Sequence, residues 1–190
     1  MRKFIAAAAV AATFVAAPAF AAAEPGVYLG LGATYDNVVG TQSAEGLGVS
    51  GLGGTVFAGY NLPLGNNVFT GIEGNFDLST ADAGDQTNGA KAVHQYGATA
   101  RLGYNLSNGA AAYVRAGYQR GRAAEYIGGT RFAASRDGLL LGAGVEANVT
   151  EKVAVRVGFD HTIFYRDKAV DPAGFGLANN KATFGVIYGF

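Results

Sequence analysis

The segment KATFGVIYGF, residues 181–190, alternates between large apolar side chains and small or polar ones. Phe184, Val186, Tyr188 and Phe190 occupy every second position, and glycine or isoleucine stands between them. Alternation of this kind is typical of a β-strand whose two faces meet different surroundings. The stretch therefore predicts a strand with one apolar face and one small or polar face.

The same period of two recurs in seven segments earlier in the chain. They are Gly26–Asp36, about Gly51–Leu62, Val68–Leu78, Tyr96–Leu106, about Ala111–Arg122, about Gly138–Val149 and Lys152–Tyr165. With the last segment they make an even number of strands, which suits a closed antiparallel barrel.

The connections between these segments alternate between short and long. Three are short turns with turn-forming residues: Pro63–Asn67, Ser107–Gly109 and Thr150–Glu151. Four are longer and rich in Gly, Ala, Asp, Asn and Ser: about Asn37–Ser50, Ser79–Lys91, Ala123–Asp137 and Arg166–Asn180. Short turns on one side and long loops on the other are typical of outer-membrane barrels, whose long loops face the outside of the cell.

Glycine is unusually abundant, with 30 among 190 residues, whereas an average protein has about 7%. Disorder does not explain the excess, because disordered chains are poor in aromatic residues and this chain has 12 Phe and 10 Tyr. An eight-stranded barrel has an interior just wide enough for side chains. Glycine on the inward face would leave room for bulky neighbours, and the apolar face would then meet lipid.

Composition also excludes several classes of protein. The chain has no cysteine, so disulfides, thiolate metal sites and a cysteine nucleophile are excluded. Its 14 basic and 14 acidic residues give no reason to expect a nucleic acid partner. A soluble lipocalin-like barrel is the alternative, but it would place Glu73, Arg101 and Arg156 in a cavity that should be apolar. The predicted fold is therefore all-β: a closed eight-stranded antiparallel up-and-down transmembrane β-barrel.

The first 21 residues have the three-part pattern of a secretory signal peptide. Arg2 and Lys3 are followed by an apolar stretch and then by a small-x-small site at Ala19 and Ala21. The apolar stretch is short of the roughly 20 residues that a membrane-spanning helix needs. We expect cleavage after Ala21, with Ala23 as the alternative, which leaves residues 22–190 as the barrel domain.

Several charged residues fall on the inward faces of the predicted strands. Since a narrow lumen disfavours unpaired charge, we expect a network of salt bridges that plugs the barrel. A gated polar pore or proton path is the alternative, and paired carboxylates could also suggest acid–base hydrolysis. The network comprises Glu73, Asp77, Arg101, Arg115, Glu146, Arg156 and Asp160.

Other polar residues fall on outward faces near the long-loop end: Arg120, Arg122, His94 and His161. They either snorkel at the interface or contact lipopolysaccharide phosphates, which arginine suits. The two histidines lie three strand steps apart, so no joint metal site is expected. Near the short-turn end, a girdle of interfacial aromatic residues is predicted from Tyr60, Tyr104, Tyr113 and Tyr188.

These features together resemble the small outer-membrane β-barrels of Gram-negative bacteria, in particular the opacity-protein/OmpA-like (porin-family) group. The strand ends Gly59–Leu62 and Gly103–Leu106 are similar to the family, as is the ending Tyr188-Gly189-Phe190. The resemblance implies an outer-membrane location and an assembly signal at Phe184, Val186, Tyr188 and Phe190. It also implies periplasmic chaperones and the barrel-assembly machinery as partners in biogenesis.

The expected function is structural or surface-interactive: a plugged monomeric barrel, without a cofactor, that supports the envelope or mediates adhesion through four extracellular loops. The composition of the loops does not identify a particular ligand. A narrow channel for small solutes is the runner-up. A lipid A-modifying enzyme is a distant third, because neither His161-Thr162-Ile163 nor His94-Gln95-Tyr96 has the serine that follows the histidine in lipid A hydrolases of this shape.

Overall fold

The computed structural model describes residues 25–41, 48–84, 88–106, 109–127, 129–165 and 176–190. The predicted signal peptide, with Ala19 and Ala21, lies outside these ranges, as does most of the predicted loop 166–180. Within them, no helix is long and apolar enough to cross a membrane.

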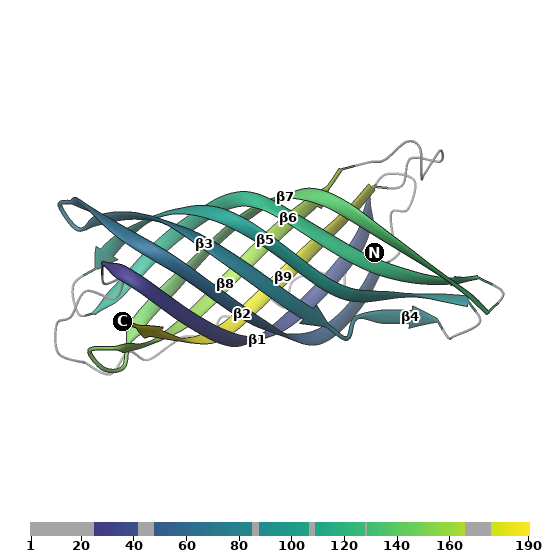
Figure 1. The fold of residues 1–190 in the computed structure, drawn as a ribbon, viewed down its shortest axis with the longest axis horizontal. Coiled ribbons are helices and arrows are strands. Elements are labelled where there is room, and N and C mark those ends of the chain that lie inside the picture. The colour runs from purple at the N-terminus through teal and green to yellow at the C-terminus, as the bar shows by residue number, and fades with distance from the viewer. Residues whose placement is uncertain (1–24, 42–47, 85–87, 107–108, 128, 166–175) are drawn as a thin grey trace, which may run out of the picture.

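The described residues form nine strands, all in one antiparallel sheet. They are β1 Gly26–Thr41, β2 Gly48–Gly65, β3 Val68–Ser79, β4 Asp82–Gly84, β5 Asn88–Leu106, β6 Ala110–Ile127, β7 Thr130–Asn148, β8 Val153–Phe164 and β9 Gly176–Gly189. Their order is β3-β2-β1-β9-β8-β7-β6-β5-β4, and β3 also pairs with β5. That pairing closes the sheet into a barrel of eight strands (Figure 1). The three-residue strand β4 pairs only with β5 and lies outside this closed set. The predicted fold class is confirmed.

The strands on the long-loop side are longer than predicted. The expected loop Ala123–Asp137 is wrong, because β6 and β7 stay paired up to Ile127 and Thr130. The expected loop Ser79–Lys91 is also wrong in part, since it contains β4 and the start of β5. The small residues in both segments are typical of a loop. The structure extends the strands instead, because continued strand pairing satisfies the backbone N–H and C=O groups of these residues. As a result, β4 to β7 project together from one end of the barrel (Figure 1).

The opposite end has tight turns. Asn66 and Asn67, which connect β2 and β3, have φ values of 51° and 66°. Two consecutive positive φ values are those of a two-residue hairpin turn, in which asparagine is favoured.

The two faces of the strands differ as the alternation predicts. Large apolar side chains point outward, and Ile72 for example is 70% exposed. The inward side chains are mostly polar or charged. A barrel that is apolar outside and polar inside fits a lipid surrounding.

One member of the predicted aromatic girdle is misplaced. Tyr60, Tyr104 and Tyr188 point outward, but Tyr113 points into the barrel and is only 4% exposed. It lies on the same face of β6 as Arg115, two residues away, because side chains alternate along a strand. The assignment of Tyr113 to the girdle is therefore wrong.

Inward glycines make room for inward aromatic rings. A Cβ atom on Gly103 would lie 2.2 Å from Cζ of Phe69, and one on Gly30 would lie 2.2 Å from the ring of Phe57. Much of the glycine excess thus belongs to the packing of the lumen, where each ring occupies the space of a missing side chain.

Candidate functional site: the charged barrel interior

The seven charged residues predicted to face inward are all buried in the barrel. They come from five neighbouring strands of the closed sheet. Glu73 and Asp77 lie on β3, Arg101 on β5, Arg115 on β6, Glu146 on β7, and Arg156 and Asp160 on β8.

Glu73 is the centre of this interior cluster. Its Oε2 atom lies 2.7 Å from Nη1 of Arg156 and 3.5 Å from Nη1 of Arg101. Its Oε1 atom pairs with Nη1 of Arg115. The Tyr28 hydroxyl donates a further hydrogen bond of 2.7 Å to Oε2. One carboxylate therefore interacts with three guanidinium groups that reach it from three other strands.

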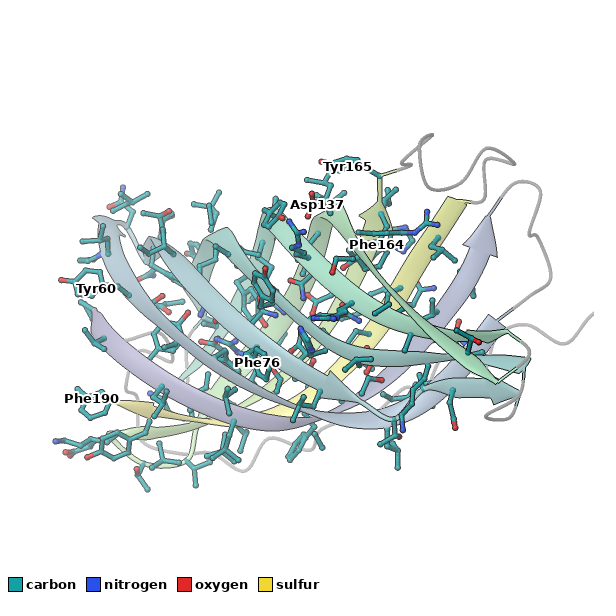
Figure 2. The ribbon with its side chains drawn as sticks, turned by 45° about the vertical axis from the view of Figure 1, so that its right-hand side comes forward. Tyr60, Phe76, Asp137, Phe164, Tyr165 and Phe190 are labelled. Atoms are coloured by element: carbon teal, nitrogen blue, oxygen red, sulfur yellow. The ribbon has the colours of Figure 1, made fainter. Side chains whose placement is uncertain are left out.

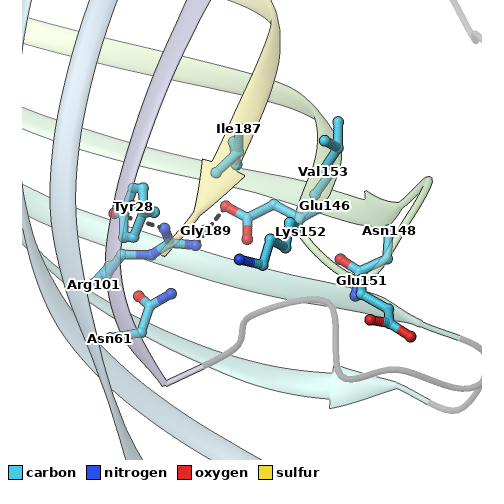
Figure 3. A pocket seen from close by; sticks show the side chains of 11 residues that line it. Tyr28, Asn61, Arg101, Glu146, Asn148, Glu151, Lys152, Val153, Ile187 and Gly189 are labelled. Carbon is cyan, nitrogen blue, oxygen red and sulfur yellow. Dashed lines mark hydrogen bonds and ion pairs between the residues drawn. The ribbon is translucent and has the colours of Figure 1, made fainter.

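Glu146 joins two of the same arginines from the other side. Its Oε1 atom accepts hydrogen bonds from Nη2 of Arg101 at 2.6 Å and from Nε of Arg156 at 2.9 Å. Figure 3 shows the Arg101 and Glu146 side chains meeting across the short-turn end of the lumen. Arg101 and Arg115 are direct cross-strand neighbours, and like charges in that relation destabilise a sheet. The carboxylates on the other strands offset this repulsion.

A second set of charges lies further toward the long-loop end. Asp160 accepts two hydrogen bonds from Arg115, of 2.8 Å from Nε and 2.6 Å from Nη2. This two-point geometry is the strongest form of arginine–carboxylate pair. Lys181 lies 2.7 Å from Oδ2 of Asp77 and 3.8 Å from Oδ2 of Asp160. Lys181 therefore links the two aspartates.

Aromatic rings enclose the guanidinium groups. The Cζ atom of Arg101 is 4.3 Å from the ring centre of Tyr113 and 5.3 Å from that of Phe69. The Cζ atom of Arg156 is 4.2 Å from the ring centre of Phe57. Cation–π contacts within about 6 Å stabilise a desolvated cation, so the rings stabilise the buried guanidinium groups as well as filling the lumen.

Sequence reasoning missed several members of this arrangement. Lys181 lies on the small or polar face of the last strand and pairs with Asp77, but it is absent from the predicted charge network. Asp36 is also buried and accepts hydrogen bonds from Thr34 and Asn179. The alternation of side chains along a strand could have identified both residues, because each lies on the same face as the inward residues of its own strand.

The cavities next to the cluster are small. One of about 40 Å³ lies at the short-turn end, lined by Tyr28, Arg101, Glu146 and Lys152 among others (Figure 3). Another of about 10 Å³ is lined by Phe57, Arg115 and Arg156 among others. A water molecule needs about 10–15 Å³ measured in this way. These spaces suit a few water molecules, and in the described part of the chain no three His, Asp or Glu side chains are placed to share a metal ion.

The four outward candidates lie on the lipid-facing surface toward the long-loop end. Arg120 is 3.3 Å from Oδ1 of Asp137, and both side chains are more than 40% exposed. Arg122 is exposed and lies opposite His94 in the register of β5 and β6. His94 stacks on Phe76 at 5.9 Å; Figure 2 shows Phe76 and Asp137.

His161 is separate from this group. It lies on β8, where its Nδ1 atom is 2.8 Å from Oδ1 of Asn180 on β9. The structure therefore brings Arg120, Arg122 and His94 onto adjacent strands and leaves His161 two strands beyond β6.

The proposed assembly signal lies on the outward face of β9. Phe184, Val186, Tyr188 and Phe190 are all exposed, and the rings of Tyr188 and Phe190 meet edge to face at 5.1 Å. Tyr60 and Phe190 lie at the same short-turn end of the barrel (Figure 2).

Comparison with known proteins agrees with this architecture. Residues 7–190 match the outer membrane protein β-barrel domain family. The chain belongs to this family. A 22 kDa outer membrane protein of Rhizobium leguminosarum bv. viciae is 29% identical over 168 residues, which are 85% of this chain and 75% of the relative.

Two solved structures show the same fold at low sequence identity. Neisserial surface protein A (NspA) has a TM-score of 0.64 at 17% identity, over 86% of this chain and 97% of its own. Ail, the attachment invasion locus protein of Yersinia pestis, has a TM-score of 0.62 at 16% identity, over 88% of this chain and 100% of its own. This chain is therefore an outer-membrane β-barrel protein by its family, and it shares the fold of NspA and Ail.

Proposed function

We propose that this protein is a sealed outer-membrane barrel that supports the envelope and presents extracellular segments for surface interaction. The interior cluster carries the proposal. Glu73 and Glu146 connect arginines from β5, β6 and β8 across the lumen, and the neighbouring cavities have room for only a few water molecules. An ion that crossed would have to break several buried charge pairs, each of which costs several kcal/mol when one partner is lost (roughly 3–5).

Surface interaction is proposed from the projecting strands and from the relatives. The ends of β5, β6 and β7 extend beyond the rest of the barrel on the long-loop side (Figure 1). Ail is an attachment protein by name, and it has also been crystallised with the heparin analogue sucrose octasulfate. Adhesion through the long-loop side is thus the proposed activity, and biogenesis is proposed to use periplasmic chaperones and the barrel-assembly machinery.

Planar-bilayer recording tests the sealed interior. The purified monomer, refolded without other porins, is expected to give no stable conductance steps. A matched variant, Arg101→Ala combined with Glu146→Ala, removes one charge of each sign from the short-turn end of the lumen and is expected to leak. A stable open channel from the wild-type protein would instead establish the runner-up, a narrow pore for small solutes.

Adhesion needs a separate assay. Cells that display the wild-type barrel should bind epithelial cells or sulfated glycan surfaces better than cells that display a variant with residues 123–137 shortened to a tight turn. Equal binding by the two, at equal surface abundance, would contradict the adhesive role of this hairpin.

A further inference from the structure

A shallow hollow interrupts the lipid-facing surface over β2, β3 and β5. Its volume is about 540 Å³, and its lining includes the outward residues Ala58, Gly74, Ala98 and Ala100. Ala58 pairs with Gly74, and Gly74 pairs with Ala98. Three adjacent strands therefore present small outward side chains at one level of the barrel.

Bulky residues bound this hollow on two sides. Toward the long-loop end, Phe76 and Tyr96 are cross-strand neighbours. Toward the short-turn end, Tyr60 and Ile72 are neighbours on β2 and β3 and line the hollow. Tyr60 and Phe76 mark the two sides in Figure 2. Lipid chains are the solvent at this depth of a membrane protein, and small residues allow a neighbour to approach the backbone closely.

Cationic side chains lie beyond the hollow toward the long-loop end, with His94 on β5 and Arg120 and Arg122 on the neighbouring strand β6. Arg120 is the cross-strand neighbour of Tyr96, and Arg122 is that of His94. Tyr96 and His94 are two and four residues from Ala98, so they lie about 7 and 13 Å along the strand at 3.3 Å per residue. Asp137 pairs with Arg120, whereas Arg122 has no ion pair among the described residues. The group carries a net positive charge.

We propose that this surface binds one lipopolysaccharide molecule at a fixed position, with a lipid A phosphate at Arg120, Arg122 and His94 and one acyl chain in the hollow. This site rests on the proposed function, in which the barrel is oriented with its long-loop end at the outer leaflet of the membrane. Arginine forms strong two-point hydrogen bonds with phosphate. The apolar hollow and the cationic group lie in the order in which such a lipid presents its acyl chain and its phosphate.

The hollow can be filled without disturbing the barrel. A Cβ atom at Gly74 would meet only the carbonyl oxygen of Gly97, at 3.8 Å. Gly74→Leu should therefore fold and occupy the space of the acyl chain. Gly54→Leu is the matched control, because Gly54 is also outward on a strand, its Cβ would meet only the carbonyl oxygen of Gly32 at 3.7 Å, and it does not line the hollow.

The test is native mass spectrometry of refolded, lipid-free protein titrated with rough lipopolysaccharide in mild detergent. The wild type and Gly54→Leu should retain one molecule each. Gly74→Leu, and separately Arg120→Gln with Arg122→Gln, should weaken retention by about tenfold or more. Cold and boiled gel mobility verifies that every variant is folded.

Three results would overturn the proposal: unchanged retention in Gly74→Leu, unchanged retention in the double arginine variant, or equal competition by phosphatidylglycerol, which would indicate a phospholipid site. The outcome is separable from that of the proposed function, because both substitutions lie outside the lumen. A conducting wild-type barrel that retains one lipopolysaccharide would contradict the sealed interior alone. A silent barrel without specific retention would contradict the lipid site alone.

Discussion

Replacing Glu73 with glutamine removes the charge on which the interior cluster depends. Glu73, Glu146 and Asp160 together carry three negative charges against the three guanidinium groups of Arg101, Arg115 and Arg156. In Glu73→Gln, two carboxylates remain for three buried cations. Leaving a buried charge without its partner costs about 3–5 kcal/mol, a large share of the 5–15 kcal/mol that stabilises a typical protein.

The expected result is a lower free energy of unfolding by about 3–5 kcal/mol. It can be measured by urea titration in detergent micelles, with far-ultraviolet circular dichroism as the probe of unfolding. Tryptophan fluorescence does not serve here, because the chain has no tryptophan. Arg120→Gln is the matched control. It breaks only the pair with Asp137, in which both side chains are more than 40% exposed, so its urea midpoint should stay close to that of the wild type.

A compensating variant tests the reasoning further. Glu73→Gln combined with Arg115→Gln restores the balance of two cations and two carboxylates around the site, so it should recover part of the lost stability through coupling between contacting residues. The explanation fails if the free energy of unfolding of Glu73→Gln lies within about 1 kcal/mol of the wild-type value. It also fails if the loss in the double variant equals the sum of the losses in the two single variants.

Three further predictions concern packing and assembly. Gly103→Ala should lower the free energy of unfolding by about 1–3 kcal/mol, because its Cβ would lie 2.2 Å from Phe69, whereas Gly74→Ala should be tolerated; equal urea midpoints would refute this. Tyr113→Ala should cost about 3–5 kcal/mol through the lost ring between Arg101 and Arg156, and the outward Tyr60→Ala clearly less; the reverse order of midpoints would restore Tyr113 to the girdle. Deleting Phe190 should slow assembly in cells more than refolding into detergent, as pulse-chase and gel-shift measurements can compare; an equal delay in both would argue against a recognition signal.

The strand pattern could be predicted because lipid and lumen demand different side chains on alternate positions. Glu73, Arg101 and Arg156 could be placed inside from parity alone. Tyr113 has the parity of Arg115, so the same rule would have placed it inside. The expectation that tyrosines near strand ends face the interface holds for Tyr60, Tyr104 and Tyr188 and fails for Tyr113.

The partners of each charge could not be predicted. In the sheet register Glu73 lies opposite Thr99, and Arg101 lies opposite Arg115. The contacts of Glu73 instead run across the lumen and depend on the stagger of the strands. The length of the β6–β7 hairpin was also missed, because glycine and alanine in residues 123–137 resemble a loop when the partner strand is unknown.

The interior cluster also has a consequence for the order of events during folding. The contacts of Glu73 with Arg115 and Arg156 span 42 and 83 positions of the chain. Contacts of such long sequence separation form late and slow the search for the native state. Until β8 has joined β3, β5 and β6, the arginines have no complete set of counter-charges and keep their water. The cluster thus stabilises the barrel only after all the strands have closed. A partly closed barrel should therefore reopen easily, whereas a closed one should unfold slowly.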